Sequence, residues 1–449
     1  MASMIQSRSA PKAHPMESWT RVTRNKRVLL LVLIFFIYGT FSSSTPDDPG
    51  PWEAILGLLL VLLVGWGAIG AMGGEFLNRK PVVPAYVIAA FAWLLIVPSV
   101  VGFLIRGHDL FDYFRDLIPL LYLLLPVFLS RHMSKDTELW KHVLQWGLCF
   151  VGVVYSLRFF LEAEGEIWTT TVYGGLDYFV MDPAVLFGAT FLLVDGLNFF
   201  YSGRLLWATI TIFAGAFAYS SILAATVRAQ IVVIVLATLV LVLIRILEHP
   251  KRFNTWAPLV AIALGLTIVT DLVVWVSWVV DSVAAKTEFA GLANLKDEEI
   301  VEILRHALSR LDVLLLGDGW GAKLYMSSSG GEVRYAHNVF FYFLWKTGIL
   351  GIFSCLGVFY WIAKHLIALW QASLQNLRLL ALWLACFNVV VVHSGLEPGF
   401  KMLTFGFILC LIVVVSPYTR HRVQTQGNGA VYTEEFLQHR NSPHQTTKR

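Results

Sequence analysis

Long apolar segments separated by short polar gaps run along most of this chain, from Val28 to Val415. A bilayer core of about 30 Å needs roughly 20 apolar residues per spanning helix, and this template finds about twelve segments. They lie at 28–45, 53–72, 82–105, 113–129, 139–161, 183–200, 205–222, 229–247, 257–280, 338–362, 379–392 and 402–416. The pattern predicts an all-α polytopic membrane protein with about twelve transmembrane helices.

One polar gap, 281–336, is much longer than the others. Within it, residues 294–317 (NLKDEEIVEILRHALSRLDVLLLG) carry acids in the first turn, basic residues later and an apolar stripe at helical spacing. The stripe consists of Ile300, Leu304, Ala307, Leu308, Leu311 and Leu315. Gly317 is a helix stop. We expect an amphipathic helix that either lies on the membrane surface or packs against the bundle.

The charge distribution predicts the orientation. If the tail 1–27 is cytoplasmic and the loops alternate, the cytoplasmic side collects 22 of the 34 Lys and Arg residues. The sequence then predicts helices one to nine in 28–280, a periplasmic loop domain at 281–336, helices ten to twelve in 337–416 and a disordered cytoplasmic tail at 417–449. A signal peptide would also fit the first apolar segment, but the spans that follow favour an uncleaved anchor.

Composition adds little to this picture, since 57% hydrophobic and 14% charged residues suit any polytopic membrane protein. Four cysteines lie inside apolar segments without metal-ligand spacing, which predicts core-filling thiols: Cys149, Cys355, Cys386 and Cys410. The carboxylates of DLFDYFRD and LKDEE do not resemble a metal cluster, and we interpret them as solvated helix ends. The sequence therefore predicts no metal site.

Three polar clusters fall on the same outer face in the predicted topology. They are Arg228 in AATVRAQIVV, the loop that ends at His337, and HSGLEPGFK, which contains His393, Glu397 and Lys401. Cationic groups, an imidazole and a carboxylate at one face could line a cavity that binds an anion and moves a proton.

Each of these residues also has a plainer interpretation. Arg228 either clamps a phosphate or extends its guanidinium to the lipid headgroups as an anchor. His337, followed by the N-cap candidate Asn338, is either a general base or a polar cap at the interface. Lys346 lies nine residues after His337, which places it on the opposite helix face, and the sequence predicts no role for it.

The segment GDGWGAK at 317–323 contains glycines that suggest a nucleotide loop. The spacing is G-x-G-x-G, however, and neither Ser nor Thr follows Lys323, so neither phosphate-loop pattern is met. We predict a tight turn at the rim of the cavity.

The segments SRLDVLLLGDGWGAK and RYAHNVFFYFLWKTGILG resemble the bacterial O-antigen ligase and polymerase superfamily. That family typically has an outer-loop Arg, a G-x-G-x-G turn and a His that opens a helix running to G-[ILV]-[ILV]-G. The matching positions are Arg310, Gly317, Gly319, Gly321, His337 with Asn338, Gly348 and Gly351. Arg228 in TVRAQ looks like an earlier family Arg, with Val and Ala where Ser and Gly are usual.

The resemblance implies a GT-C-like membrane glycosyltransferase of the bacterial inner membrane. It implies transfer of a glycan from undecaprenyl diphosphate to an acceptor hydroxyl of the lipid A core at the periplasmic face, without metal, cofactor or nucleic acid. It implies that Arg228 and Arg310 bind the diphosphate and that His337 is catalytic, while Asn338, Glu397 and Arg334 are possible supporting residues.

Two alternatives remain open. A polymerase of O-antigen or exopolysaccharide, in the same superfamily, would use a carrier-linked glycan as acceptor. A lipid-linked glycan flippase or secondary transporter would also have about twelve spans, but transporters bury ionisable residues near mid-membrane within related repeats.

Overall fold

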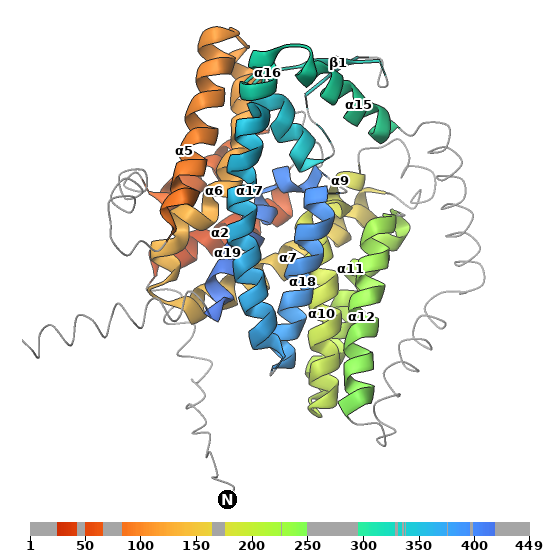
Figure 1. Ribbon diagram of the computed structural model, residues 1–449. Helices are drawn as coiled ribbons and strands as arrows, with labels where there is room; N and C mark the ends of the chain where they lie inside the picture. Colours follow the sequence, from red (N-terminus) through yellow and green to blue (C-terminus); the bar gives the residue numbers. More distant parts are fainter. Residues whose placement is uncertain are drawn as a thin grey trace, which may run out of the picture.

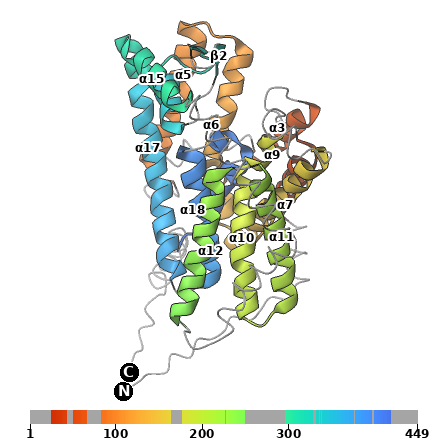
Figure 2. The same ribbon diagram turned by 90° about the vertical axis from the view of Figure 1, so that its right-hand side faces the viewer.

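The computed structural model describes residues 25–42, 50–65, 83–163, 176–225, 227–248, 295–327, 331–334, 336, 338–374, 376–395 and 398–417. These residues form helices and one two-stranded antiparallel sheet (Figures 1 and 2). The helices are α2 (Lys26–Phe41), α3 (Pro51–Val64), α5 (Ala85–Ser99), the π-helix η1 (Val100–Ile105), α6 (Leu110–Met133), α7 (Thr137–Glu162), α9 (Asp177–Val180), α10 (Pro183–Tyr201), α11 (Leu205–Ala224), α12 (Arg228–Glu248), α15 (Leu295–Leu308), α16 (Leu311–Leu316), α17 (Val339–Ser373), α18 (Leu377–Gly395), the 3₁₀ helix η3 (Pro398–Lys401) and α19 (Leu403–Val415). The strands are β1 (Leu324–Met326) and β2 (Gly331–Val333).

Seven helical segments in the described part of the chain are long and apolar enough to cross a membrane. They are Ala85–Ile105, Leu110–Met133, Thr137–Glu162, Pro183–Tyr201, Leu205–Ala224, Val339–Ser373 and Leu377–Gly395, and shorter apolar helices lie at Pro51–Val64, Ala229–Ile244 and Leu403–Val415. The architecture is therefore that of an all-α multi-pass membrane protein, as predicted. The total of twelve spans stays a prediction, and the segment predicted at 257–280 lies outside the described residues.

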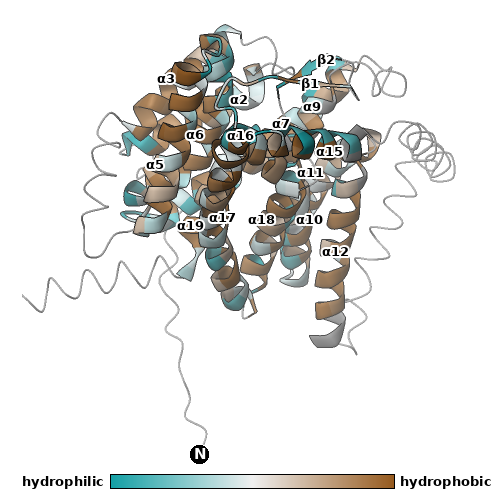
Figure 3. Cartoon of the chain, turned by 45° about the horizontal axis from the view of Figure 1, so that its top comes forward, coloured by the Kyte–Doolittle hydropathy of each residue, from teal (hydrophilic) through white to brown (hydrophobic). Residues whose placement is uncertain are grey.

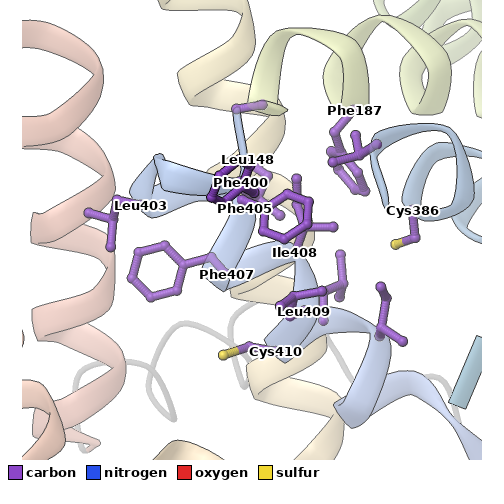
Figure 4. Close-up of a cluster of buried hydrophobic side chains, with 14 of the residues drawn as sticks. Leu148, Phe187, Cys386, Phe400, Leu403, Phe405, Phe407, Ile408, Leu409 and Cys410 are labelled. Atoms are coloured by element: carbon purple, nitrogen blue, oxygen red, sulfur yellow. The ribbon is translucent and has the colours of Figure 1, made fainter. Parts of the chain in front are cut away.

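The core of the bundle forms around α10 and α19. Every residue of α19 is buried, which fits a helix that is apolar on all sides and packs against helices all round. Figure 4 shows its side chains beside Leu148 of α7, Phe187 of α10 and Cys386 of α18. The four cysteines are free and buried, so the prediction that they fill the core is confirmed.

The helices α15 and α16 and the β1–β2 hairpin lie together at one end of the bundle, called the loop end below (Figures 1 and 3). The hairpin pairs Tyr325 with Glu332, and the backbone N–H of Ser327 at its turn donates to Glu302 of α15. The extramembrane segment predicted from its polarity thus includes a small packed unit.

The amphipathic segment 294–317 is two helices instead of the single one predicted. The chain leaves helical geometry at Ser309 and Arg310, and Gly317, with a φ of 73°, ends α16 as predicted. Of the predicted stripe, Ala307 is buried, whereas Leu304 and Leu308 before the break and Leu311 and Leu315 after it are exposed.

The segment predicted as one anchoring helix at 338–362 also contains a break. Gly348 has a φ of 66° and a ψ of −172°, which interrupts α17 after its first nine residues. A break of this kind leaves the carbonyls before it without helical donors. Those of Trp345 and Lys346 accept the backbone N–H groups of Asp318 at 3.0 Å and Gly319 at 2.9 Å. The glycine turn 317–321 therefore caps the first part of α17.

The same turn also supplies hydrogen-bond donors that are missing in α5. Pro98 has no N–H, so the carbonyl of Leu94 lacks its usual helical donor. The indole Nε1 of Trp320 donates to that carbonyl at 3.0 Å, and the Trp320 backbone N–H donates to the Pro98 carbonyl at 3.1 Å. The tight turn is confirmed, whereas its place at the rim of a cavity stays a prediction. The turn is buried between two broken helices and joins them.

We expect Gly319→Ala to destabilise the protein by about 1–3 kcal/mol through strain and overpacking. Gly319 has a φ of 85°, and an added Cβ would meet the backbone of Gly102 and the carbonyl of Pro98. Thermal unfolding in detergent measures the loss. Gly107→Ala is the matched control, because Gly107 has a φ of 68° but no atom within 4 Å of an added Cβ. Equal losses in the two variants would contradict the close packing at Gly319.

Candidate functional site

A buried ion pair between Lys346 and Asp116 lies at the loop end. The Lys346 Nζ is 2.6 Å from Asp116 Oδ2 and also donates to the carbonyl of Ala322, and its side chain is 0% exposed. A charge inside an apolar helix requires such a partner, because its desolvation is otherwise uncompensated. Lys346, for which the sequence offered no role, thus has a partner on a helix far away in the chain.

Asp116 also fixes the glycine turn. It accepts the backbone N–H of Gly321 at 2.7 Å and the hydroxyl of Tyr342 at 3.3 Å. One carboxylate therefore joins α6, the turn and the first part of α17. The interpretation of these carboxylates as a solvated helix end was wrong for Asp112 and Asp116, which are 6% and 8% exposed. The exposed N-cap is Asp109, whose carboxylate accepts the backbone N–H groups of Phe111 and Asp112.

Asp112 holds the two ends of the hairpin. Lys323 directly precedes β1 and lies 2.6 Å from Asp112 Oδ2, while Arg334 directly follows β2 and lies 3.3 Å from Asp112 Oδ1. Both cations are partly exposed, with side-chain exposures of 31% and 39%, whereas that of Asp112 is 7%. The predicted supporting residue Arg334 is thus held in place by a buried carboxylate.

A further cation, Lys401 of η3, lies over the ring of Tyr342. Its Nζ is 4.8 Å from the ring centroid, and the Nζ of Lys346 is 5.7 Å from the same centroid. Burial lowers the pKa of Lys401 to about 7, and repulsion by Lys346 and Arg115 acts in the same direction, against the attraction of Asp116 and Glu299.

We call Asp112, Asp116, Lys323, Arg334, Tyr342, Lys346 and Lys401 the charge cluster. Lys323, Arg334 and Lys346 outnumber its two carboxylates, which gives the site a positive excess. Lys401, whose pKa is about 7, adds a further positive charge mainly below pH 7. Such an excess favours an anionic ligand over a cationic one.

We expect protein stability to rise with pH above about pH 7 in a way that depends on Lys401. Its pKa is about 7 in the folded protein and 10.5 ordinarily. At a pH between these two values, Lys401 therefore carries its proton more often in the unfolded chain than in the folded protein. Lys401 therefore adds at most about 1.4 kcal/mol to the free energy of unfolding for each pH unit. Unfolding temperatures of the wild type and Lys401→Met, measured from about pH 7 to pH 9, should diverge. Parallel curves would show that Lys401 keeps its proton.

Arg310, predicted to bind diphosphate, belongs to a second group of ion pairs at the surface of the loop end. Its guanidinium is 2.6 Å from Asp312, which is also 2.7 Å from Arg106. Hydrogen bonding by Arg310 lowers the pKa of Asp312. Arg106 further lies 3.9 Å from Asp318 of the glycine turn. Arg310 is 56% exposed, so its guanidinium is accessible from outside the bundle.

Asn338 caps α17 as predicted. Its Oδ1 accepts the backbone N–H of Phe340 at 2.9 Å, and its Nδ2 donates to the carbonyl of Gly395 at 3.1 Å, at the end of α18. This bond joins the chain segment that contains His337 to the one that contains Glu397. Both of those residues lie outside the described part of the structure.

Arg228 is the first residue of α12, but its side chain is also outside the described part. Figure 1 shows that α12 begins at the same end of the bundle at which α18 finishes. The described backbone of the three predicted polar segments therefore points toward the same end of the bundle, with the start of α12 lying below the loop end in Figure 1.

Sequence reasoning missed the roles of Asp112, Asp116 and Lys346, although two signals were present. A lysine in an apolar helix requires a carboxylate partner. Asp112 and Asp116 are four residues apart, which places them on one face of α6. No group of three or more His, Cys, Asp or Glu side chains that could hold a metal ion occurs in the described ranges.

Comparison with known proteins does not extend this description. Neither a scan against protein-family models nor a search of curated proteins found a match to the chain.

Proposed function

We propose that the chain is a membrane glycosyltransferase of the O-antigen ligase type in the bacterial inner membrane, with cytoplasmic termini and a periplasmic site. The observation that carries the proposal is the position of the matched motif parts. Arg310, the glycine turn and Asn338, which directly follows His337, belong to one end of the bundle, beside a cluster with positive excess. A diphosphate leaving group suits such a site.

In the proposed reaction, the acceptor hydroxyl oxygen attacks the anomeric carbon of the lipid-linked glycan. The bond from that carbon to the diphosphate oxygen breaks, and undecaprenyl diphosphate leaves with the electron pair. His337 takes the hydroxyl proton, and Arg228 and Arg310 offset the charge on the diphosphate. Glu397 orients a hydroxyl or an arginine.

The charge cluster supports this reaction by holding the loop in place. Asp112 fixes Arg334, three residues before His337, and Asp116 fixes the glycine turn to α6. Asp116 neutralises Lys346, and Asp312 pairs with Arg310. The accessible positive excess at the loop end therefore comes from Lys323 and Arg334, which are partly exposed and share the single carboxylate of Asp112. Pre-organised charge of this kind stabilises a transition state without reorganisation at the moment of reaction.

One observation favours a second candidate. Lys346 and Asp116 are a buried ionisable pair on two spanning helices, a feature that transporters and flippases also have, although this pair lies at the loop end and not near mid-membrane. A lipid-linked glycan flippase is therefore the alternative function to be tested.

The test uses purified full-length protein in lipid nanodiscs with an undecaprenyl diphosphate-linked glycan and lipid A core. We expect glycan to become attached to lipid A core, visible as a mass increase equal to the glycan, without added metal or nucleotide sugar. Elongation of the carrier-linked glycan instead would identify a polymerase. A nanodisc has no separate compartments, so a flippase would give neither product, and translocation in proteoliposomes would then replace the proposal.

A further inference from the structure

The helices α15 and α16 have apolar side chains on two sides. Ile303, Ala307 and Val313 are buried against the bundle. A second set, spaced by three or four residues, is exposed by 38–71%: Val301, Leu304, Leu308, Leu311 and Leu315. Within α15 and within α16 these exposed side chains recur at helical spacing, which is the pattern of a helix that meets a second apolar environment.

Two contacts fix the level of α16 along the bundle. Arg106 directly follows the apolar span Ala85–Ile105, and its guanidinium is 2.7 Å from Asp312 of α16. On the other side, the backbone of Leu315 packs against Gly348, where the long second part of α17 begins. The helix α16 therefore lies level with the end of the apolar span Ala85–Ile105 and with the start of the second part of α17.

The two spans that α16 contacts also have exposed apolar side chains at this level. Leu104 and Ile105 at the end of η1 are 71% and 67% exposed, and Phe353 of α17 is 64% exposed. In a membrane-spanning helix such side chains face lipid. Because α16 contacts Arg106 at the end of one span and Gly348 of the other, its exposed stripe adds to their lipid-facing surface at the loop end.

We propose that α15 and α16 lie in the bilayer interface, with the exposed stripe among the upper acyl chains and Arg305 and Arg310 at the level of the lipid phosphates. The bilayer is the favoured occupant because the stripe adds to the apolar surface of the spans and exposed arginines flank it. This proposal does not depend on the proposed function, since it would hold equally for a flippase.

The test places an environment-sensitive fluorophore, NBD, at Leu308→Cys in the full-length protein in nanodiscs of phosphatidylethanolamine and phosphatidylglycerol. The native cysteines are buried, and wild-type protein labelled in parallel gives the background. Phe353→Cys on α17 is the lipid-facing reference, and Tyr325→Cys on the hairpin, 67% exposed, is the reference for water. Leu311→Cys repeats the measurement on the next helix.

We expect the fluorophore at positions 308 and 311 to be quenched by lipids with a doxyl group near the head of the acyl chain, as at position 353. Iodide in the buffer should quench it several-fold less than at position 325. Iodide quenching equal to that at position 325 would overturn the proposal. Protection from both quenchers would also overturn it, because the stripe would then be covered by protein, such as a second copy. An unchanged unfolding temperature shows that the substitutions leave the fold intact.

Discussion

Replacing Lys346 with methionine is expected to destabilise the folded protein by about 3–5 kcal/mol, the cost of breaking a buried ion pair. Methionine fills a similar volume but leaves the Asp116 carboxylate without its ammonium partner, and it removes the donor to the Ala322 carbonyl. Unfolding in detergent micelles by heat or denaturant measures the change.

Two controls make this prediction specific. Lys364→Met changes the same residue type on the same helix, but Lys364 is exposed over the ring of Tyr360, and we expect an effect within about 0.5 kcal/mol. Adding Asp116→Asn to Lys346→Met removes the unpaired charge and should restore part of the stability. Equal losses for the two lysine variants, or no recovery in the double variant, would contradict the role of the ion pair.

Replacing His337 with alanine is expected to lower glycan transfer by about 10²–10⁴-fold, the usual contribution of a general base. Because the acceptor hydroxyl loses its proton in the proposed reaction, the loss should appear in the turnover number, with the unfolding temperature unchanged. The purified transfer assay in nanodiscs measures both the turnover number and the apparent affinity for the donor.

His142→Ala, near the start of α7, is the matched control and should keep full activity. His337→Gln should also remove a limb of the pH–rate profile with an apparent pKa of about 6–7. Full activity in His337→Ala would show that another group accepts the proton, whereas loss of donor affinity alone would make His337 a binding residue.

Asn338→Ala tests the neighbouring cap, and we expect it to cost about 1 kcal/mol of stability.

Local patterns in the sequence were sufficient to predict many elements of the fold. Apolar segments of spanning length, the stop at Gly317, the N-cap at Asn338 and the tight turn at 317–321 each depend on neighbouring residues. The cysteines could be placed in the core because their surroundings in the chain are uniformly apolar. The breaks in the helices were harder to predict from the sequence, since a glycine in an apolar segment is compatible with both a continuous and an interrupted helix.

The candidate site was only partly predictable. The motifs around Arg310 and His337 directed attention to the segments that the structure brings to the loop end. Arg334 was among the predicted residues, but its partner Asp112 was not. Carboxylates near a helix start are usually solvated, and nothing local indicates that a hairpin from much later in the chain will cover them.

The sequence by itself determined an all-α membrane protein, because apolar length and helical periodicity are local properties of the chain. Only the tertiary structure decided that Lys346 pairs with Asp116, and that the glycine turn supplies the donors missing from α17 and α5. These choices depend on which distant segments meet. Desolvation makes an unpaired charge or carbonyl costly in the bundle, but it does not specify which of several possible partners will satisfy it.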